Sequence, residues 1–159
     1  MSRLQSLKTA TALHDVAALL KYKATTLAYI LYVKQNKYHS FALGKRGGGT
    51  RTIHAPSEDL KLLQKNLSNL LQDCAEEINH VRGFKDQFAC GFKRRLSIID
   101  NATKHRRRRY VLNLDLQEFF PTINFGRVRA FFMLNRDFAL QPSLVNSSEA
   151  EIVAQIGCW

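Results

Sequence analysis

Hydrophobic residues near the N-terminus recur every three or four positions, which is the spacing of one face of an α-helix. The first repeat ends at Leu20, and a second begins at Leu27, after Thr25 and Thr26. This pattern predicts two short N-terminal helices. The repeating positions are Leu13, Val16, Ala17 and Leu20, followed by Leu27, Ile30 and Leu31.

The next segment has the pattern of two strands joined by a turn. Extended runs at 38–43 and 51–55 flank three consecutive glycines at 47–49, and Pro56 follows the second run. Glycine lets the backbone reverse tightly, so this order predicts a β-hairpin.

A continuous apolar stripe after the hairpin predicts one long helix. Ser57 is placed to cap it, and Glu58 and Asp59 fall in its first turn, where carboxylates are favourable. We interpret the stripe as the core-facing side of the helix. It consists of Leu60, Leu63, Leu67, Leu70, Leu71, Cys74 and Ile78.

Three further elements are expected in the second half of the chain. Residues 97–105 predict a short helix, residues 110–115 alternate and are rich in strand formers, and apolar spacing after Pro121 indicates another helix. The tail contains one weak amphipathic stretch, at 152–156.

The size and charge of the chain restrict its class and its partners. With 159 residues and 45% hydrophobic content, it has what one globular domain needs. Its formal charge of +11 favours polyanions, nucleic acid first. Residues 82–109 hold ten Lys or Arg and two Asp, which is +8 of that charge. A solvated surface is the alternative to phosphate binding.

Other site classes are not supported. The cysteines Cys74, Cys90 and Cys158 form no C-x-x-C pair and are odd in number, so neither a disulfide framework nor a zinc site is indicated. The longest uncharged apolar run near the N-terminus, 24–33, is about half the ~20 residues that span a bilayer. We expect a cytoplasmic protein without membrane attachment. The sequence 44–46 lacks the Walker A order, so ATPase chemistry is not supported.

Asp115 is the main candidate for chemistry. It ends the predicted apolar strand, and a buried, unpaired carboxylate costs several kcal/mol, so it requires a partner, a metal ion or a proton. Mg²⁺ typically takes one or two protein carboxylates while substrate phosphates complete its coordination. An ion pair with a nearby arginine is the structural alternative.

Three motifs resemble one enzyme family. The sequence VLNLDLQEFFPTI at 111–123 resembles the first metal-binding motif of reverse transcriptases, in the LDLxxFFPxI form of bacterial retron and group II intron enzymes. FALGKRGGGTRTI at 41–53, with Pro56 and LKLLQ at 60–64, is similar to the fingers hairpin and the helix after it. NATKH at 101–105 matches NAxxH, a signature particular to retron reverse transcriptases.

The resemblance implies an α+β fold: right-hand polymerase fingers plus a partial palm, with N-terminal helices, a β-hairpin, a long helix and a palm strand. Residues 1–36 would be a helical extension, 37–109 the fingers with the NAxxH segment, and 110–159 the start of the palm. The LPQG and YxDD motifs of the family are absent from the sequence. We therefore expect an N-terminal piece of a longer polymerase, inactive alone.

The same resemblance implies site residues. Asp115 and the carbonyl of Leu116 would bind two Mg²⁺ ions together with carboxylates outside this chain. Phe120 would pack under the sugar of the incoming dNTP and exclude a 2′-hydroxyl; simple core packing is its alternative, and core is the expectation for Phe119. Phosphoryl transfer also needs cations on the triphosphate, for which we select Arg51.

Lys45 or Arg46 would assist Arg51 from the hairpin tip.

Asn101 and His105 are four residues apart and therefore lie on one face of the predicted helix. In retron enzymes this segment is associated with RNA recognition, whereas a helix-capping Asn and a surface His are the structural alternative. The cationic residues expected to contact RNA with them are Lys93, Arg94, Arg95, Lys104, Arg106, Arg107, Arg108 and Arg109.

The expected function is that of a bacterial retron reverse transcriptase. Such an enzyme copies part of a structured noncoding RNA (msr–msd) into branched msDNA from dNTPs, and acts with an effector protein in defence against phage. Two alternatives stay open: a noncatalytic RNA-binding module with a fingers-like fold, and a group II intron-type enzyme, which leaves Asn101 to His105 unexplained.

Overall fold

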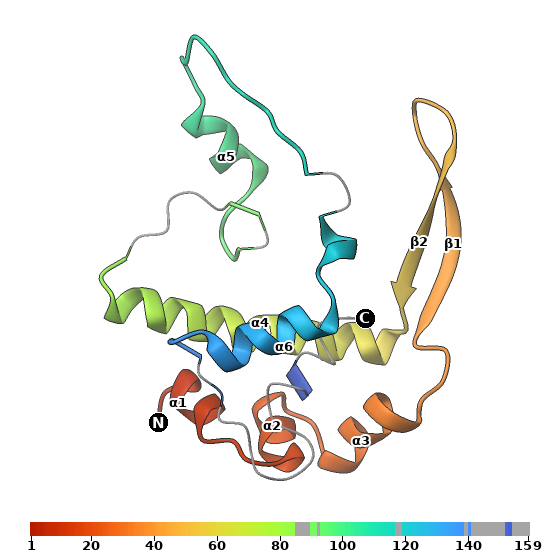
Figure 1. Ribbon diagram of the computed structural model, residues 1–159, viewed down its shortest axis with the longest axis vertical. Helices are drawn as coiled ribbons and strands as arrows, with labels where there is room; N and C mark the ends of the chain where they lie inside the picture. Colours follow the sequence, from red (N-terminus) through yellow and green to blue (C-terminus); the bar gives the residue numbers. More distant parts are fainter. Residues whose placement is uncertain (85–89, 92, 117–118, 139, 141–151, 154–159) are drawn as a thin grey trace.

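A computed structural model of the chain describes residues 1–84, 90–91, 93–116, 119–138, 140 and 152–153. A long central helix, α4, separates a layer of short N-terminal helices from two projections on its other side (Figure 1). The elements are α1 (Arg3–Lys8), α2 (Leu13–Leu19), α3 (Ala24–Ala28), the π-helical turn η1 (Tyr29–Val33), β1 (Tyr38–Gly44), β2 (Thr50–Pro56), α4 (Glu58–Val81), α5 (Ile98–Lys104), the 3₁₀ turn η2 (Phe120–Thr122) and α6 (Phe125–Leu134).

The hydrophobic core lies between α4 and the helices around it. The apolar stripe of α4 is buried as expected, with Leu71 and Ile78 packed at its margin. Ile152 and Val153 from the predicted C-terminal stretch are also buried. The remaining core residues are Leu7, Ala10, Val16, Ala17, Leu20, Leu27, Ile30, Leu31, Phe132, Phe138 and Leu140.

The sequence pattern missed α1, because a distant residue stabilises it. The Glu77 carboxylate on α4 accepts the backbone N–H groups of Arg3 at 2.8 Å and Leu4 at 3.2 Å, and the Ser2 hydroxyl accepts that of Gln5 at 3.1 Å. These bonds satisfy donors that a helix N-terminus leaves unpaired. The two helices predicted further along correspond to α2 and to α3 with η1.

The β-hairpin is confirmed. Its antiparallel register runs from Tyr38 opposite Pro56 to Gly44 opposite Thr50. Gly48 and Gly49 have φ values of 90° and 82°, a backbone region in which glycine avoids the steric cost of a side chain. Only Tyr38 of the hairpin packs against the core, so the hairpin projects from the body by its base.

Polar contacts attach this base to α4. Lys34 Nζ lies 2.5 Å from Asp59 Oδ2, and the Tyr38 hydroxyl accepts a hydrogen bond from Gln64 Nε2 at 2.9 Å. Ser57 has no side-chain capping bond to the backbone of α4, contrary to expectation, because its hydroxyl donates to Asp59 Oδ1 at 2.7 Å. The bonds from Lys34 and Ser57 lower the pKa of Asp59 to about 2.

The predicted palm strand at 110–115 is wrong for this structure. A strand exists only where a neighbour takes up its backbone hydrogen bonds, and in the described part of the chain the one sheet consists of β1 and β2. Residues 110–116 are therefore without regular structure, and all their side chains are exposed. The fold is α+β in content, while its division into fingers and palm stays a prediction.

Within the described residues, no single helix is long and apolar enough to cross a membrane. The segments Leu13–Leu19 and Ala24–Val33 together have the length and composition of a span, but they are bent by 103°.

Candidate functional site

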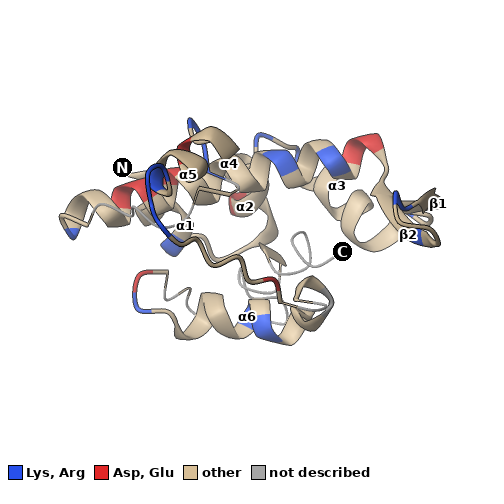
Figure 2. Cartoon of the chain, turned by 90° about the horizontal axis from the view of Figure 1, so that it is seen from above, with Lys and Arg blue, Asp and Glu red and all other residues tan. Residues whose placement is uncertain are grey.

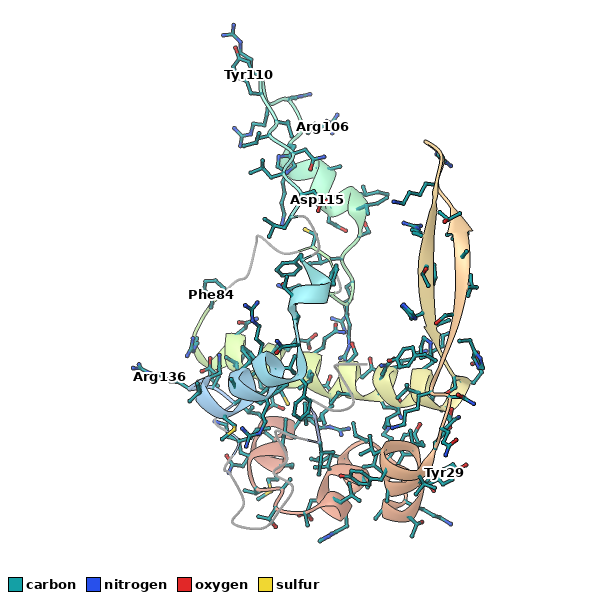
Figure 3. All side chains as sticks on the ribbon, turned by 45° about the vertical axis from the view of Figure 1, so that its right-hand side comes forward. Tyr29, Phe84, Arg106, Tyr110, Asp115 and Arg136 are labelled. Atoms are coloured by element: carbon teal, nitrogen blue, oxygen red, sulfur yellow. The ribbon has the colours of Figure 1, made fainter. Side chains whose placement is uncertain are left out.

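The second projection consists of residues 93–116, which we call the arm. It contains α5 and rises above the C-terminal half of α4, whereas the hairpin rises from the N-terminal end (Figure 1). All of the residues predicted to contact RNA lie on the arm, together with Asp115 (Figure 3).

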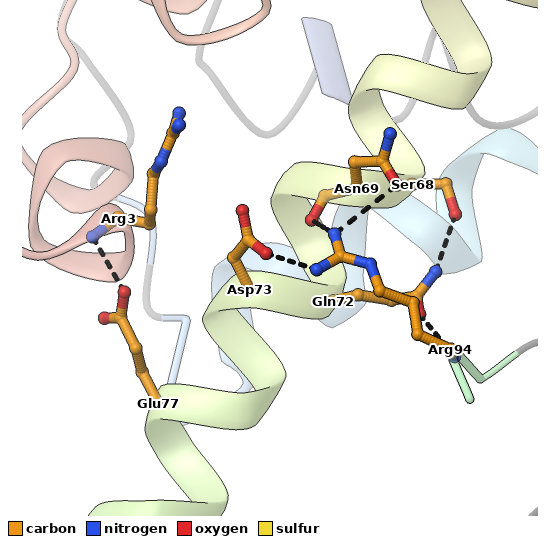
Figure 4. Close-up of polar contacts among 7 residues, drawn as sticks. All are labelled: Arg3, Ser68, Asn69, Gln72, Asp73, Glu77 and Arg94. Atoms are coloured by element: carbon orange, nitrogen blue, oxygen red, sulfur yellow. Dashed lines mark hydrogen bonds and ion pairs between the residues drawn. The ribbon is translucent and has the colours of Figure 1, made fainter. Parts of the chain in front are cut away.

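Arg94 anchors the arm to α4 (Figure 4). Its guanidinium donates to Asp73 Oδ1 at 2.5 Å and to the carbonyl of Asn69, and its backbone N–H donates to Gln72 Oε1 at 2.9 Å. The Arg94 and Asp73 side chains are each 32% exposed. Both terminal nitrogens of the Arg94 guanidinium thus have protein acceptors, which gives this residue an anchoring role; its contact with RNA stays a prediction. Arg95, by contrast, is exposed and turns the chain at a φ of 63°.

The helix predicted at 97–105 is confirmed as α5, and Ser97 rather than Asn101 caps it. The Ser97 hydroxyl accepts the N–H of Ile99 at 3.2 Å, and Asp100 Oδ2 accepts the backbone N–H and the hydroxyl of Ser97 at 2.7 Å each. These bonds lower the pKa of Asp100. Asn101 and His105 are exposed, so the capping alternative for Asn101 is wrong.

The arginine run forms the turn at the end of the arm and appears as a continuous blue loop beside α5 (Figure 2). Residues 106–109 are all exposed, and Arg107 reverses the chain at a φ of 59°. The Arg109 guanidinium lies 5.4 Å from the ring centre of Tyr110, whose side chain is 80% exposed. Cations beside an exposed aromatic ring suit nucleic acid, because bases stack on rings while phosphates pair with arginine.

Tyr110 is a further candidate for contact with a base, which the sequence pattern did not indicate because it assigned this residue to a strand. Its signal was its position directly after four arginines. Two lysines of the predicted RNA set have protein surroundings: Lys104 Nζ donates to Sγ of the buried Cys90 at 3.1 Å, and Lys93 is half-buried.

Asp115 is exposed, so the premise that it is a buried carboxylate is wrong. The predicted burial required a sheet around it, and the described segment has none. No described residue forms an ion pair with Asp115, which removes the arginine alternative within that part of the chain. The Leu116 carbonyl accepts the N–H of Phe119 at 3.4 Å and retains a second lone pair.

These oxygens fit part of a magnesium site. A carboxylate and a backbone carbonyl are hard ligands of the kind that Mg²⁺ prefers. Within the residues that the structure describes, no group of three or more His, Cys, Asp or Glu side chains is placed to hold a metal ion. The described donors therefore supply at most part of the two-ion site that the resemblance implies.

The phenylalanines after Asp115 lie at η2. Phe119 is 46% exposed and Phe120 66% exposed, and their rings meet edge to face with centroids 5.4 Å apart. The prediction that Phe119 belongs to the core is wrong, and core packing does not account for Phe120 either. The role of Phe120 at a sugar stays a prediction.

The structure brings the predicted triphosphate ligands together at the end of the hairpin. Lys45, Arg46 and Arg51 are all exposed there. Arg51 is paired across the strands with Leu43. No hydrogen bond or ion pair between described residues joins this end to Asp115, and the two groups lie on separate projections (Figures 1 and 3).

Comparison with known proteins gives this geometry a family. No protein-family model matches the chain. The Retron Ec86 reverse transcriptase of Escherichia coli is 32% identical over 123 residues, which is 76% of this chain and 36% of that protein. The chain is a relative of the retron reverse transcriptases. The Retron Mx65 reverse transcriptase of Myxococcus xanthus is 36% identical over 123 residues, covering 75% of this chain and 27% of that protein.

The Retron Mx162 reverse transcriptase of Myxococcus xanthus is 34% identical over 93 residues, or 58% of this chain and 17% of that protein. The resemblance that the three motifs predicted is thus confirmed, and the chain is a reverse-transcriptase-like N-terminal region. It spans about a third or less of the length of the retron reverse transcriptases that it matches.

Proposed function

We propose that the chain is the N-terminal part of a retron RNA-directed DNA polymerase, which copies its structured noncoding RNA (msr–msd) into branched msDNA. The observation that carries the proposal is Asp115: an exposed carboxylate without an ion-pair partner among the described residues, in a chain related to retron reverse transcriptases over three quarters of its length. An exposed acid leaves its oxygens available to a cation.

Each named residue has a role in this proposal. Asp115 and the Leu116 carbonyl would hold Mg²⁺, with further carboxylates supplied from outside this chain. A pair of such ions activates the attacking hydroxyl and stabilises the leaving group in phosphoryl transfer. Arg51 binds the triphosphate of the incoming dNTP by charge-assisted hydrogen bonds, assisted by Lys45 or Arg46.

The arm binds the RNA backbone in the proposed function. Residues 106–109 are exposed arginines, and each guanidinium can contact phosphate with a planar fork of donors. Arg95, Asn101 and His105 lie exposed on the same arm. We further infer that the polymerase works in the bacterial cytoplasm with an effector protein in defence against phage, as an expectation from the retron family.

Polymerisation by the intact protein that contains this chain tests the metal role. With its noncoding RNA, dNTPs and Mg²⁺, Asp115→Asn should lower DNA synthesis by at least about 10³-fold, because the amide carries no charge for the cation. Glu76→Gln is the matched control: it makes the same change at an exposed position on α4 and should leave synthesis unchanged. Full synthesis by Asp115→Asn would remove the metal assignment.

The sugar role of Phe120 has a separate test. Phe120→Val should let the intact polymerase incorporate ribonucleotides, because the smaller side chain leaves room for a 2′-hydroxyl. Phe119→Val changes the neighbouring ring, which is also exposed, and should leave sugar selectivity unaltered. Equal selectivity in both variants would count against a gate at Phe120.

A noncatalytic RNA-binding module is the second candidate, and the concentration of cations on the arm favours it. Both candidates predict that the isolated chain binds RNA, with log affinity falling by about 0.7 to 0.9 per unit of log salt for each phosphate neutralised. Only the polymerase predicts DNA synthesis by the intact protein that is lost with Asp115→Asn. A salt-independent affinity of the chain for RNA would contradict both. A group II intron-type enzyme is less well supported, because it leaves the sequence from Asn101 to His105 unexplained.

A further inference from the structure

A hollow of about 550 Å³ opens between α5 and the chain that returns along the arm. The hollow is shallow and open to solvent, so it would cover one side of a ligand rather than enclose it. Two of its lining residues, His105 and Arg106, already have proposed contacts with RNA, but the hollow itself has no role among those assigned above. The residues that line it are Ile99, Ala102, Thr103, His105, Arg106 and Val111.

The hollow has an apolar lining and a cationic margin. Ile99 and Val111 are 72% and 57% exposed and line the hollow together, and contiguous exposed apolar surface marks binding sites more often than singly exposed residues do. The Thr103 hydroxyl donates a hydrogen bond to the Ile99 carbonyl at 2.7 Å, so it is already paired within α5. His105 and Arg106 contribute the polar groups.

Charge restricts what can occupy this hollow. No acidic residue lies between Asp100 and Asp115, whereas five Lys or Arg do. A second copy of this chain would bring the same positive surface and be repelled. A nucleotide combines a flat base, which apolar side chains can cover, with a phosphate that arginine can pair.

We propose that the hollow binds one unpaired base of the RNA, whose adjoining phosphate pairs with Arg106. This inference rests on the proposed RNA-binding function and names the part of the RNA that is bound. Bases in an A-form stem are stacked and inaccessible, whereas bases in loops and bulges can leave the stack. The arm therefore discriminates single-stranded from double-stranded RNA, which contact between arginines and phosphates alone does not.

The experiment fills the hollow without changing charge. Ala102→Trp places a large side chain in it, and Ala75→Trp makes the same substitution at an exposed position on α4. Ala102→Trp should weaken the affinity of the chain for a single-stranded RNA oligonucleotide about tenfold, the scale of one base contact. Its affinity for duplex RNA and its salt slope should stay within error of the unmodified chain. Ala75→Trp should change neither affinity.

Two further measurements address the base and the phosphate separately. The fluorescence of 2-aminopurine in the single-stranded oligonucleotide should change on binding to the chain, and Val111→Ser should reduce the affinity without adding bulk. Arg106→Gln should lower the salt slope by the contribution of about one phosphate. Circular dichroism verifies that each variant retains its helices.

Three results would overturn the inference: single-stranded RNA bound equally well by Ala102→Trp, equal weakening for single-stranded and duplex RNA, or 2-aminopurine fluorescence that does not respond to binding. The last result would assign the hollow to a protein contact. If the unmodified chain binds RNA and Ala102→Trp does not weaken that binding, this inference alone is refuted. Absence of RNA binding by the unmodified chain refutes the proposed function as well.

Discussion

Arg94 is the residue whose replacement tests most directly how the arm is held. Arg94→Ala removes the ion pair with Asp73 and the hydrogen bond to the Asn69 carbonyl. Hydrogen bonds to charged groups contribute about 1.5 to 3 kcal/mol each when protected from water. Both side chains of the pair are 32% exposed, so solvent screening reduces this figure. We expect a loss of about 1 to 2 kcal/mol in the free energy of unfolding.

A double-mutant cycle isolates the pair from the other contacts. Arg94→Ala, Asp73→Ala and the double variant would be unfolded in urea and followed by circular dichroism. We expect a coupling energy of about 0.5 to 1 kcal/mol between the two residues, with an unchanged dependence on urea concentration. High salt should reduce the coupling but not abolish it, because the pair is partly shielded.

Arg108→Ala provides the matched control, since it removes an arginine that is exposed on the same arm. It should leave the free energy of unfolding within about 0.5 kcal/mol and weaken RNA binding. Arg94→Ala should instead lower the free energy of unfolding and leave RNA affinity unchanged. Zero coupling with Asp73, together with a loss of RNA affinity at unchanged stability, would refute the anchoring role and favour RNA binding as the role of Arg94.

Three other predictions concern single sites. Because the pKa of Asp59 is lowered to about 2, its contribution to stability is complete above about pH 4 and is lost as the pH falls toward 2. Asp59→Asn should remove that part of the pH dependence and lower the free energy of unfolding by about 1 kcal/mol at neutral pH, after discounting for a side chain that is 37% exposed. Urea titrations at a series of pH values test this, and an unaltered pH profile would contradict the contact with Lys34. Burial raises the pKa of the Cys74 thiol to about 11, so mass spectrometry should find it unlabelled by maleimide until the chain unfolds; labelling in the folded state would contradict its burial. Arg107→Gly should raise the unfolding free energy by about 1 kcal/mol, because glycine tolerates a φ of 59°, while it lowers the salt slope of RNA binding; a loss of stability would count against the left-handed turn.

Elements defined by local spacing were predictable from the sequence. The hairpin depends on glycines within the turn, and α4 and α5 depend on apolar periodicity or on a cap three residues away. The helix α1 depends on Glu77, which is 74 residues from Arg3 in the chain. Such contacts follow from tertiary packing, and single-sequence patterns do not contain them.

The candidate site divides in the same way. The residue types and their order indicated Asp115, Arg51 and the arginine run, and this order was sufficient to identify the family. Their surroundings were not predictable, because exposure depends on which segments pack together. The apolar alternation before Asp115 suggested burial in a sheet, yet no described strand pairs with it.

The hairpin from His39 onward contributes nothing to the hydrophobic cluster, which is built from helices and the segments beside them. Residues 39–55 can therefore be exchanged as a cassette between distant relatives, with Tyr38 and the helical body kept. We expect such chimeras to fold as readily as the parent. Sequence change in this segment is therefore not restricted by the packing of the hydrophobic cluster described here.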